Sequence, residues 1–134
     1  MTDRTPQAIS IRVRYAETDR MGVVYHANYF VWFEVGRCEL LRLVGRSYRE
    51  MEDAGVGLPV IEAQCEYKSP AHYDDELQVK TSGKLLSPAR VEFVYEISRP
   101  CDGTVNAVGR TVHAAVDATG RPCRLPDYIR ELLP

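Results

Sequence analysis

Alternation of apolar and polar residues predicts strands near the start of the chain and throughout its second half. In Ala8–Tyr15, the residues Ile9, Ile11, Val13 and Tyr15 fall on one side, which is the period of two of a half-buried strand. The same period predicts four further strands, at Ile61–Lys68, Glu76–Leu86, Arg90–Arg99 and Val105–Asp117. In the last of these the even positions form the apolar face, and Gly109 indicates a bend.

A long apolar segment, Val23–Val44, is too long for a strand and predicts a helix. A helix of roughly twenty residues is about 30 Å long, enough to cross a small domain. Apolar residues in the first half of this segment point in every direction at 100° per residue, so we expect that half to be buried all round. Glu34 and Arg37, three residues apart, are placed to pair. Shorter helices are predicted at Ser47–Ala54 and Asp127–Leu133.

The order of these elements predicts an α+β fold. One strand and one long helix are followed by four strands with short connections, which favour an antiparallel run. A single long apolar helix needs one curved sheet to cover it. At 134 residues the chain fits one domain, 1–134, with a sizeable core.

Composition narrows the class of protein. A formal net charge of −2 gives no electrostatic reason to expect nucleic acid as a partner. The first ten residues are polar and no segment has the apolar length needed to cross a bilayer, so we expect no membrane insertion and a cytoplasmic location. The four cysteines are scattered without a CxxC pair, which favours reduced thiols.

The candidate chemistry lies at Asp19, on a short turn that ends at Gly22, just ahead of the predicted helix. The first N–H groups of a helix lack intrahelical partners and carry partial positive charge. A carboxylate beside free N–H groups around His26 would place a base or nucleophile next to a site that polarises a carbonyl. The alternative is that Asp19 only complements the helix dipole.

Two motifs carry a family resemblance. The first runs through Tyr15, Thr18, Asp19, Gly22, Val23, Val24, Tyr25, His26, Asn28, Tyr29, Glu34 and Arg37. It resembles the signature of hotdog-fold acyl-CoA thioesterases of the 4-hydroxybenzoyl-CoA thioesterase type, including the Tol-Pal-associated branch. The second motif, Tyr67–Ala71 with Asp74–Leu77, resembles the segment that enters the third strand in the same family.

The resemblance implies a hotdog fold and hydrolysis of an acyl-CoA to a free acid and coenzyme A. Asp19 would attack the thioester carbonyl or activate water, while the backbone N–H near His26 polarises the carbonyl. Neither a metal nor a cofactor is implied, since coenzyme A is part of the substrate. A homodimer that joins two sheets edge to edge, and pairs again into a homotetramer, is also implied.

The remaining site residues have competing interpretations. The His26 side chain is a proton shuttle, an oxyanion contact or a packing residue, and Tyr15 orients Asp19 or is an ordinary core aromatic. Residues predicted to contact the substrate are Tyr25, Asn28, Tyr29, Lys68 and Arg90. Of these, Lys68 and Arg90 are candidates for holding the phosphates of coenzyme A.

Other functions are weighed against hydrolysis. The sequence contains no GxSxG elbow, and its three histidines lie far apart without HExxH spacing. The nearest rival enzyme on a hotdog fold is a 3-hydroxyacyl-thioester dehydratase or hydratase, whose pairing of His with an acidic residue has no match here. A different class is a non-catalytic protein that binds acyl-CoA or acyl-carrier protein, against which an intact Asp19 argues.

Overall fold

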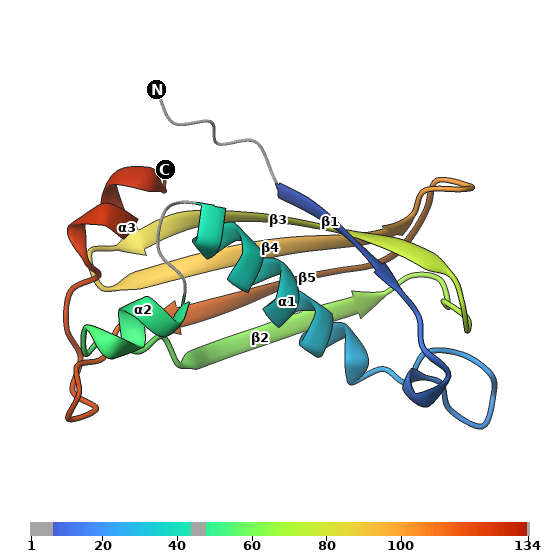
Figure 1. Cartoon of the computed structure of the whole chain (residues 1–134), viewed down its shortest axis with the longest axis horizontal. Helices are drawn as coiled ribbons and strands as arrows, with labels where there is room; N and C mark the ends of the chain where they lie inside the picture. Colours follow the sequence, from blue (N-terminus) through green and yellow to red (C-terminus); the bar gives the residue numbers. More distant parts are fainter. Residues whose placement is uncertain (1–6, 44–47, 134) are drawn as a thin grey trace.

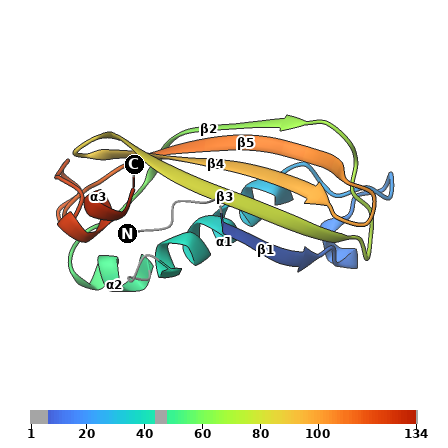
Figure 2. The same cartoon turned by 90° about the horizontal axis from the view of Figure 1, so that it is seen from above.

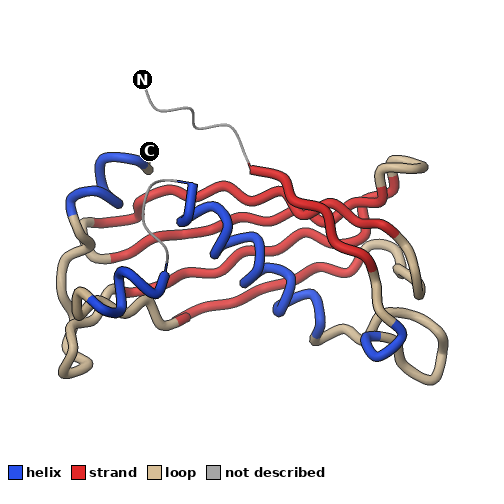
Figure 3. Tube along the Cα trace, in the orientation of Figure 1, coloured by secondary structure: helices blue, strands red, loops and turns tan. Residues whose placement is uncertain are grey.

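The computed structural model describes residues 7–43 and 48–133. In chain order the elements are β1 (Gln7–Arg12), the 3₁₀ turn η1 (Tyr15–Glu17), α1 (Asn28–Leu43), α2 (Tyr48–Asp53), β2 (Val60–Tyr67), β3 (Glu76–Ser87), β4 (Arg90–Arg99), β5 (Thr104–Ala114) and α3 (Asp127–Leu132) (Figures 1 and 3). The predicted end of the long helix at Val44 and start of the next at Ser47 lie outside the described residues. None of the described helices is long and apolar enough to cross a bilayer.

Helix α1 lies across one face of a five-stranded antiparallel sheet, seen from above in Figure 2. The predicted α+β architecture, a long helix against five strands, is confirmed. Strand β4 matches its predicted bounds, and Val91, Phe93, Tyr95 and Ile97 are at most 1% exposed. Burial of each such side chain contributes about 1.5–3 kcal/mol, so this face anchors the core.

The ring of Phe33 fills a space that Gly109 leaves open. It stacks on Tyr95 with the centroids 4.3 Å apart and the planes 9° from parallel. A Cβ at position 109 would lie 2.4 Å from Phe33 Cε2. Gly109 stays in register with Cys65 on one side and Tyr95 on the other. The pairing thus passes through Gly109 without a register shift, and this glycine allows close packing of α1 on the sheet.

Strand β2 does not pair with the strand that follows it. The strand order is β1-β3-β4-β5-β2, so β2 lies at an edge beside β5. The β3–β4 and β4–β5 hairpins are as predicted, but the expected run of four consecutive strands is wrong at its first step. Segment 68–75 must instead cross from one side of the sheet to the other. On its way it meets the residues ahead of α1, where the Val24 N–H donates to the Ala71 carbonyl at 2.8 Å.

Helix α1 begins at Asn28, five residues later than predicted. Val23 and Val24 form isolated β-bridges instead, with His72 and Thr18 respectively. These bridges, one to the nearby Thr18 and one to the distant His72, satisfy backbone groups that a helix would otherwise satisfy. The apolar run ahead of Asn28 is thus an extended loop held by the crossing segment.

More of the surface of α1 is exposed to solvent than predicted. Val31 is 51% and Val35 39% exposed, so the first half of the helix is not buried all round. Glu34 is exposed, whereas Arg37 is buried and its Nη1 donates to the Tyr95 hydroxyl at 3.2 Å. The two charged side chains therefore lie in different surroundings, Glu34 in solvent and Arg37 beside Tyr95 in the core.

The side of β5 that faces α1 carries two polar residues, contrary to prediction. Thr111 and His113 are registered with the buried residues Phe93 and Val91 and are themselves buried. The apolar even positions, such as Val112, take the opposite face of the sheet, where Val112 is only 3% exposed. Alternation alone therefore did not identify the residues of β5 that pack toward α1.

A chain of hydrogen bonds lets these polar groups fit inside. Arg37 donates a hydrogen bond to the Tyr95 hydroxyl, which lies 2.6 Å from Thr111 Oγ1. Thr111 Oγ1 lies 2.9 Å from His113 Nε2. On the other side of the ring, His113 Nδ1 lies 2.8 Å from the Leu58 carbonyl. Because a carbonyl only accepts, the Nδ1–H of His113 donates to Leu58. Burial lowers the pKa of His113 to about 4, so near pH 7 the ring is neutral and its Nε2 accepts from the Thr111 hydroxyl. Thr111 Oγ1 in turn accepts from the Tyr95 hydroxyl.

Candidate active site

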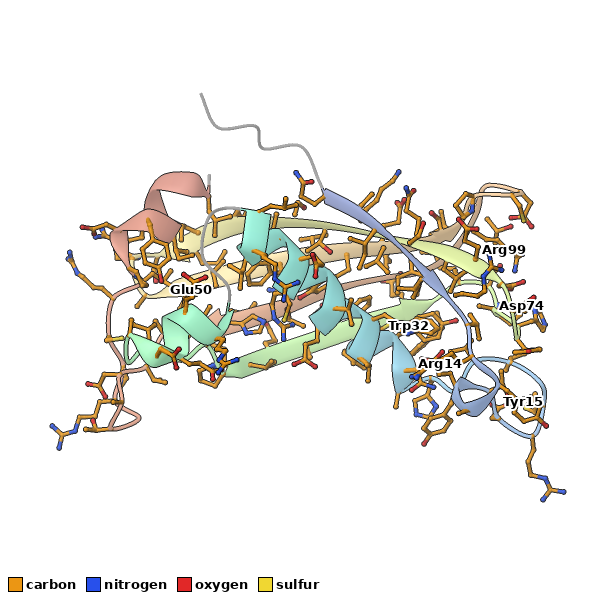
Figure 4. The ribbon with its side chains drawn as sticks, viewed as in Figure 1. Arg14, Tyr15, Trp32, Glu50, Asp74 and Arg99 are labelled. Atoms are coloured by element: carbon orange, nitrogen blue, oxygen red, sulfur yellow. The ribbon has the colours of Figure 1, made fainter. Side chains whose placement is uncertain are left out.

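Glu17 holds together the loop that precedes α1. Its buried carboxylate accepts hydrogen bonds from the backbone N–H of Arg14 (2.7 Å), the Arg14 guanidinium (3.3 Å) and the Trp32 indole (3.3 Å). Its carbonyl accepts from the Tyr25 N–H and the Asn28 side chain. Figure 4 shows Arg14 close to the helix end that carries Trp32. Burial alone would raise the pKa of Glu17, but the contacts with Arg14 and Trp32 together lower it, so the carboxylate stays ionised.

Asp19 forms a hydrogen-bonded turn with the residues after it. Its Oδ1 accepts from the N–H groups of Met21 (2.8 Å) and Val23 (3.4 Å). Gly22 has a φ of 81°, a conformation that favours glycine, as its place in the turn predicted. Within the described residues, Oδ2 of Asp19 has no protein partner. The turn thus fixes one carboxylate oxygen and leaves the other for a substrate or water.

Free backbone N–H groups lie just before α1. The N–H groups of Asn28, Tyr29 and Phe30 already donate to the carbonyls three residues earlier. In the part of the chain that the structure describes, those of His26 and Ala27 donate to no protein acceptor. The helix starts later than predicted, yet the unpaired donors still fall at His26. Such donors suit an oxygen that gains negative charge.

Asp19 and His26 line the same cleft, which has a volume of about 320 Å³. The rest of its lining comes from the loop, from α1, from the end of β2 and from the crossing segment, as Val23, Val24, Tyr29, Tyr67, Lys68, Ser69 and Pro70. Tyr29 is buried, and desolvation raises the pKa of its hydroxyl. The fold therefore brings together four predicted site residues, Asp19, His26, Tyr29 and Lys68, in a largely apolar cleft typical of small-molecule sites.

A second cleft, of about 610 Å³, lies around Tyr15, Tyr25 and Asn28, and Asp19 borders it as well. Tyr15 opens η1 rather than ending β1, so the predicted strand is too long. The Tyr15 ring is 77% exposed and packs edge to face on Tyr73 at 5.8 Å, which rules out the core-aromatic interpretation. Asp19 consequently stands between an apolar cleft and a more polar one.

The two predicted phosphate contacts lie at opposite ends of the sheet. Lys68 lines the smaller cleft and pairs with Glu66 at 3.4 Å. Arg90 is the first residue of β4. Tyr67 of β2 and Ile97 of β4 both pair with Ala107 of β5, so Tyr67 lies level with Ile97 in the sheet. Seven residues along a strand are roughly 23 Å. Within one chain, Arg90 is therefore not brought together with Asp19.

The groups available for chemistry are a carboxylate, an imidazole and backbone donors. Among the described side chains, no three His, Cys, Asp or Glu residues lie close enough to share a metal ion. All four cysteines are free thiols, and burial raises the pKa of both Cys38 and Cys65. Neither thiol is thereby activated as a nucleophile.

Two residues that shape the site were not predicted as site residues. Glu17 joins the loop to α1, and the Tyr67 hydroxyl donates to the His26 carbonyl at 3.0 Å. Glu17 lies next to the acidic turn and Tyr67 begins the second motif, so the sequence predicted a site near both residues. The bonds that join Glu17 to α1 and Tyr67 to His26, however, span 11 to 41 residues, beyond the reach of a local pattern.

Comparison with known proteins agrees with this geometry. Residues 13–133 match the thioesterase-like superfamily. YneP of Bacillus subtilis, named a candidate acyl-CoA thioesterase, is 42% identical over 107 residues, or 80% of this chain and 77% of YneP. The acyl-CoA thioester hydrolase YbgC of Escherichia coli is 39% identical over 119 residues, or 89% of each chain.

Solved structures of related proteins show that the similarity extends from the sequence to the fold. A DHNA-CoA thioesterase from Staphylococcus aureus has a TM-score of 0.86 at 36% identity, covering 94% of this chain and 85% of that one. A hypothetical protein from Aquifex aeolicus has a TM-score of 0.89 at 35% identity, covering 96% and 100%. Sequence and structure thus agree over nearly the whole length, and the chain belongs to the thioesterase-like superfamily and has its hotdog fold.

Proposed function

We propose that this protein is an acyl-CoA thioesterase, which hydrolyses a thioester to a carboxylic acid and coenzyme A. The observation that carries the proposal is that Asp19 and the free N–H group of His26 belong to residues of one cleft. The names of YneP, YbgC and the S. aureus enzyme support thioester hydrolysis as the class of reaction. Thioester cleavage needs both a nucleophile, or a base for water, and a donor for the oxyanion.

The carbonyl carbon would lie beside Asp19, with its oxygen toward the N–H groups of His26 and Ala27. In one route Asp19 attacks, the C–S bond breaks, and water then hydrolyses the mixed anhydride. In the other, Asp19 takes a proton from water, which attacks directly. Both routes release coenzyme A as a thiolate, which needs a proton, and the exposed His26 imidazole is the candidate donor.

The smaller cleft is the proposed acyl site, since its walls include Val23, Val24, Tyr29, Tyr67 and Pro70. Tyr15, Tyr25 and Asn28, in the more polar cleft, are the proposed contacts for the rest of the substrate. Lys68 can meet a phosphate from its place beside the acyl site. A contact between Arg90 and coenzyme A would have to come from another subunit.

A panel of acyl-CoAs tests the proposal. We expect release of free thiol from at least one short, long or aromatic acyl-CoA. Placement in the Tol-Pal-associated branch, which rests on the Tyr25-His26 pair, predicts a preference for short or medium aliphatic chains. Hydration of an enoyl-CoA without thiol release would indicate the dehydratase class, and tight binding without turnover would indicate a binding protein.

We also propose a homodimer, assembling further to a homotetramer, formed through β2. This strand lies at a sheet edge and seven of its eight residues are exposed, including Val60, Ile61 and Tyr67 at 48–49%. Val31 and Val35 on α1 are exposed as well. An uncovered apolar edge strand is a template for pairing with a second chain. The open edge and these exposed apolar side chains support this arrangement.

Light scattering on the purified protein measures the oligomer. We expect a mass of two or four times 15.2 kDa. Ile61→Lys, which adds a charge to the edge strand, should shift the mass toward one chain. Leu86→Lys is the matched control, because Leu86 is 46% exposed at the far end of β3. A monomeric wild type, or equal behaviour of the two variants, would contradict assembly through β2.

A further inference from the structure

Tyr67 is the last residue of β2, and it meets the turn that begins α1. Its hydroxyl donates a hydrogen bond to the His26 carbonyl at 3.0 Å. The two residues are 41 positions apart. This contact therefore joins an edge strand to the segment that carries the free N–H groups of the cleft.

The ring of Tyr67 is held in place from two sides. It packs edge to face on Tyr29, with centroids 5.3 Å apart and planes at 78°. It also packs against the His26 ring at 6.2 Å and 86°. Edge-to-face pairs are favourable arrangements of aromatic rings. The phenol is thus aimed at the His26 carbonyl by its neighbours, although the side chain is about half exposed.

The hydrogen bond controls one peptide plane. The His26 carbonyl belongs to the planar peptide unit whose nitrogen is that of Ala27, and in a trans peptide the C=O and N–H point in opposite directions. Besides the Tyr67 hydroxyl, the Tyr29 N–H donates to this carbonyl, over a long distance of 3.4 Å. Tyr67 provides the shorter bond and so sets the direction in which the Ala27 N–H points.

The donor keeps its proton over a wide pH range. Desolvation, together with the neighbouring Cys65, raises the pKa of Tyr67 to about 12. A neutral hydroxyl must use its one hydrogen for the carbonyl, so the polarity of this bond does not reverse. The contact therefore keeps its polarity at every pH below about 12.

We propose that Tyr67 is a positioning residue, which holds the His26–Ala27 peptide so that the N–H groups before α1 are aimed at the substrate carbonyl. This inference rests on the proposed function. It assigns to Tyr67 an effect on the chemical step rather than on substrate affinity. Donors that must be aligned with a developing oxyanion lose effectiveness when their peptide can rotate.

Tyr67→Phe tests this role, since it keeps the ring and removes only the hydroxyl. Loss of an oxyanion donor itself lowers kcat by about 10²–10³-fold. For loosened alignment we expect a smaller fall in kcat, about tenfold, with KM within about twofold of wild type. Tyr73→Phe is the matched control, because Tyr73 is an exposed tyrosine outside the lining of the cleft. It should behave as wild type, and both variants should melt at the wild-type temperature.

Amide hydrogen exchange gives a readout independent of turnover. In Tyr67→Phe we expect faster exchange at the Tyr29 N–H, which shares the His26 carbonyl, and no change in Tyr73→Phe. A kcat unchanged in Tyr67→Phe, or a raised KM at constant kcat, would overturn the positioning role. Unchanged exchange at Tyr29 would overturn it too. If the wild type released no thiol, the proposed function would fail, while the exchange measurement would still decide whether Tyr67 orders this turn.

Discussion

Asp19→Asn is expected to lower the rate of thioester hydrolysis by at least about 10²–10⁴-fold, the usual contribution of a positioned acid or base. The asparagine side-chain oxygen can still accept from the Met21 and Val23 N–H groups, so the turn should keep its shape. Its neutral amide, however, neither attacks a carbonyl nor takes a proton from water. The loss should therefore appear in kcat with an unchanged melting temperature.

Asp117→Asn is a control with the same local geometry. Asp117 Oδ1 accepts from the N–H groups two and four residues later, those of Thr119 and Arg121, at 2.9 and 3.1 Å. Asp19 uses the same spacing, but Asp117 lies on an exposed turn and lines neither cleft. We expect wild-type turnover from Asp117→Asn. Substantial thiol release by Asp19→Asn would remove Asp19 from the mechanism and leave only the fold assignment.

Acidification is expected to lower the free energy of unfolding by about 3 kcal/mol between pH 6.5 and about 4, through His113. Burial lowers the pKa of His113 to about 4, with the charge of Arg37 acting in the same direction and the bond to Leu58 opposing it. In the unfolded chain this histidine takes up a proton below its ordinary pKa of 6.5. The unfolded state binds more protons in this window, so acid favours unfolding there, at up to about 1.4 kcal/mol per pH unit.

The structural reason is the burial of the imidazole. The Nδ1–H of His113 donates to the Leu58 carbonyl, so a second proton would go to Nε2 and would change the direction of its bond with Thr111. Desolvation of the charged ring is the largest cost of that proton, and the positive charge of Arg37 adds to it.

Denaturant titrations at several pH values measure this effect. Wild-type stability should be level above pH 6.5 and decline below it, whereas His113→Gln should be less stable at neutral pH but lack that decline. His72→Gln, at an exposed position, should keep the wild-type profile. Stabilisation by the Glu17 carboxylate, whose pKa is lowered from 4.5, is lost only as pH falls further, so the upper part of the window reports on His113. A flat wild-type profile from pH 6.5 to about 5 would exclude this role.

Much of the fold and of the site could be predicted from local pattern. Strand β4 was placed correctly because its alternation is strict and its apolar side chains are large. Asp19, Gly22 and His26 lie in one short segment, so chain connectivity alone keeps them near each other and ahead of α1. The turn at Gly22 follows from the backbone freedom of glycine, which is likewise a local property.

Other features could not be predicted because they depend on distant partners. Val23 and Val24 are apolar enough for a helix, yet the bridge of Val23 to His72 and the hydrogen bond of Val24 to Ala71 hold them extended and delay α1 to Asn28. Thr111 and His113 look like the solvent face of β5, yet the chain from Arg37 to Leu58 satisfies their polar atoms in the core. Local propensity is weak compared with such tertiary hydrogen bonds and packing.

By itself, the amino-acid sequence determined the kinds of element, the apolar face of β4 and the close approach of a carboxylate to the segment before a helix. Tertiary structure alone decided that β2 lies beside β5, that segment 68–75 crosses to the loop before α1, and that Tyr67 therefore meets His26. The pattern of side chains indicates which faces of an element will be buried. It does not specify which distant strand will pack against a face or which carbonyl will accept its hydrogen bonds. That choice is made when the whole core packs and most buried polar groups must find a partner.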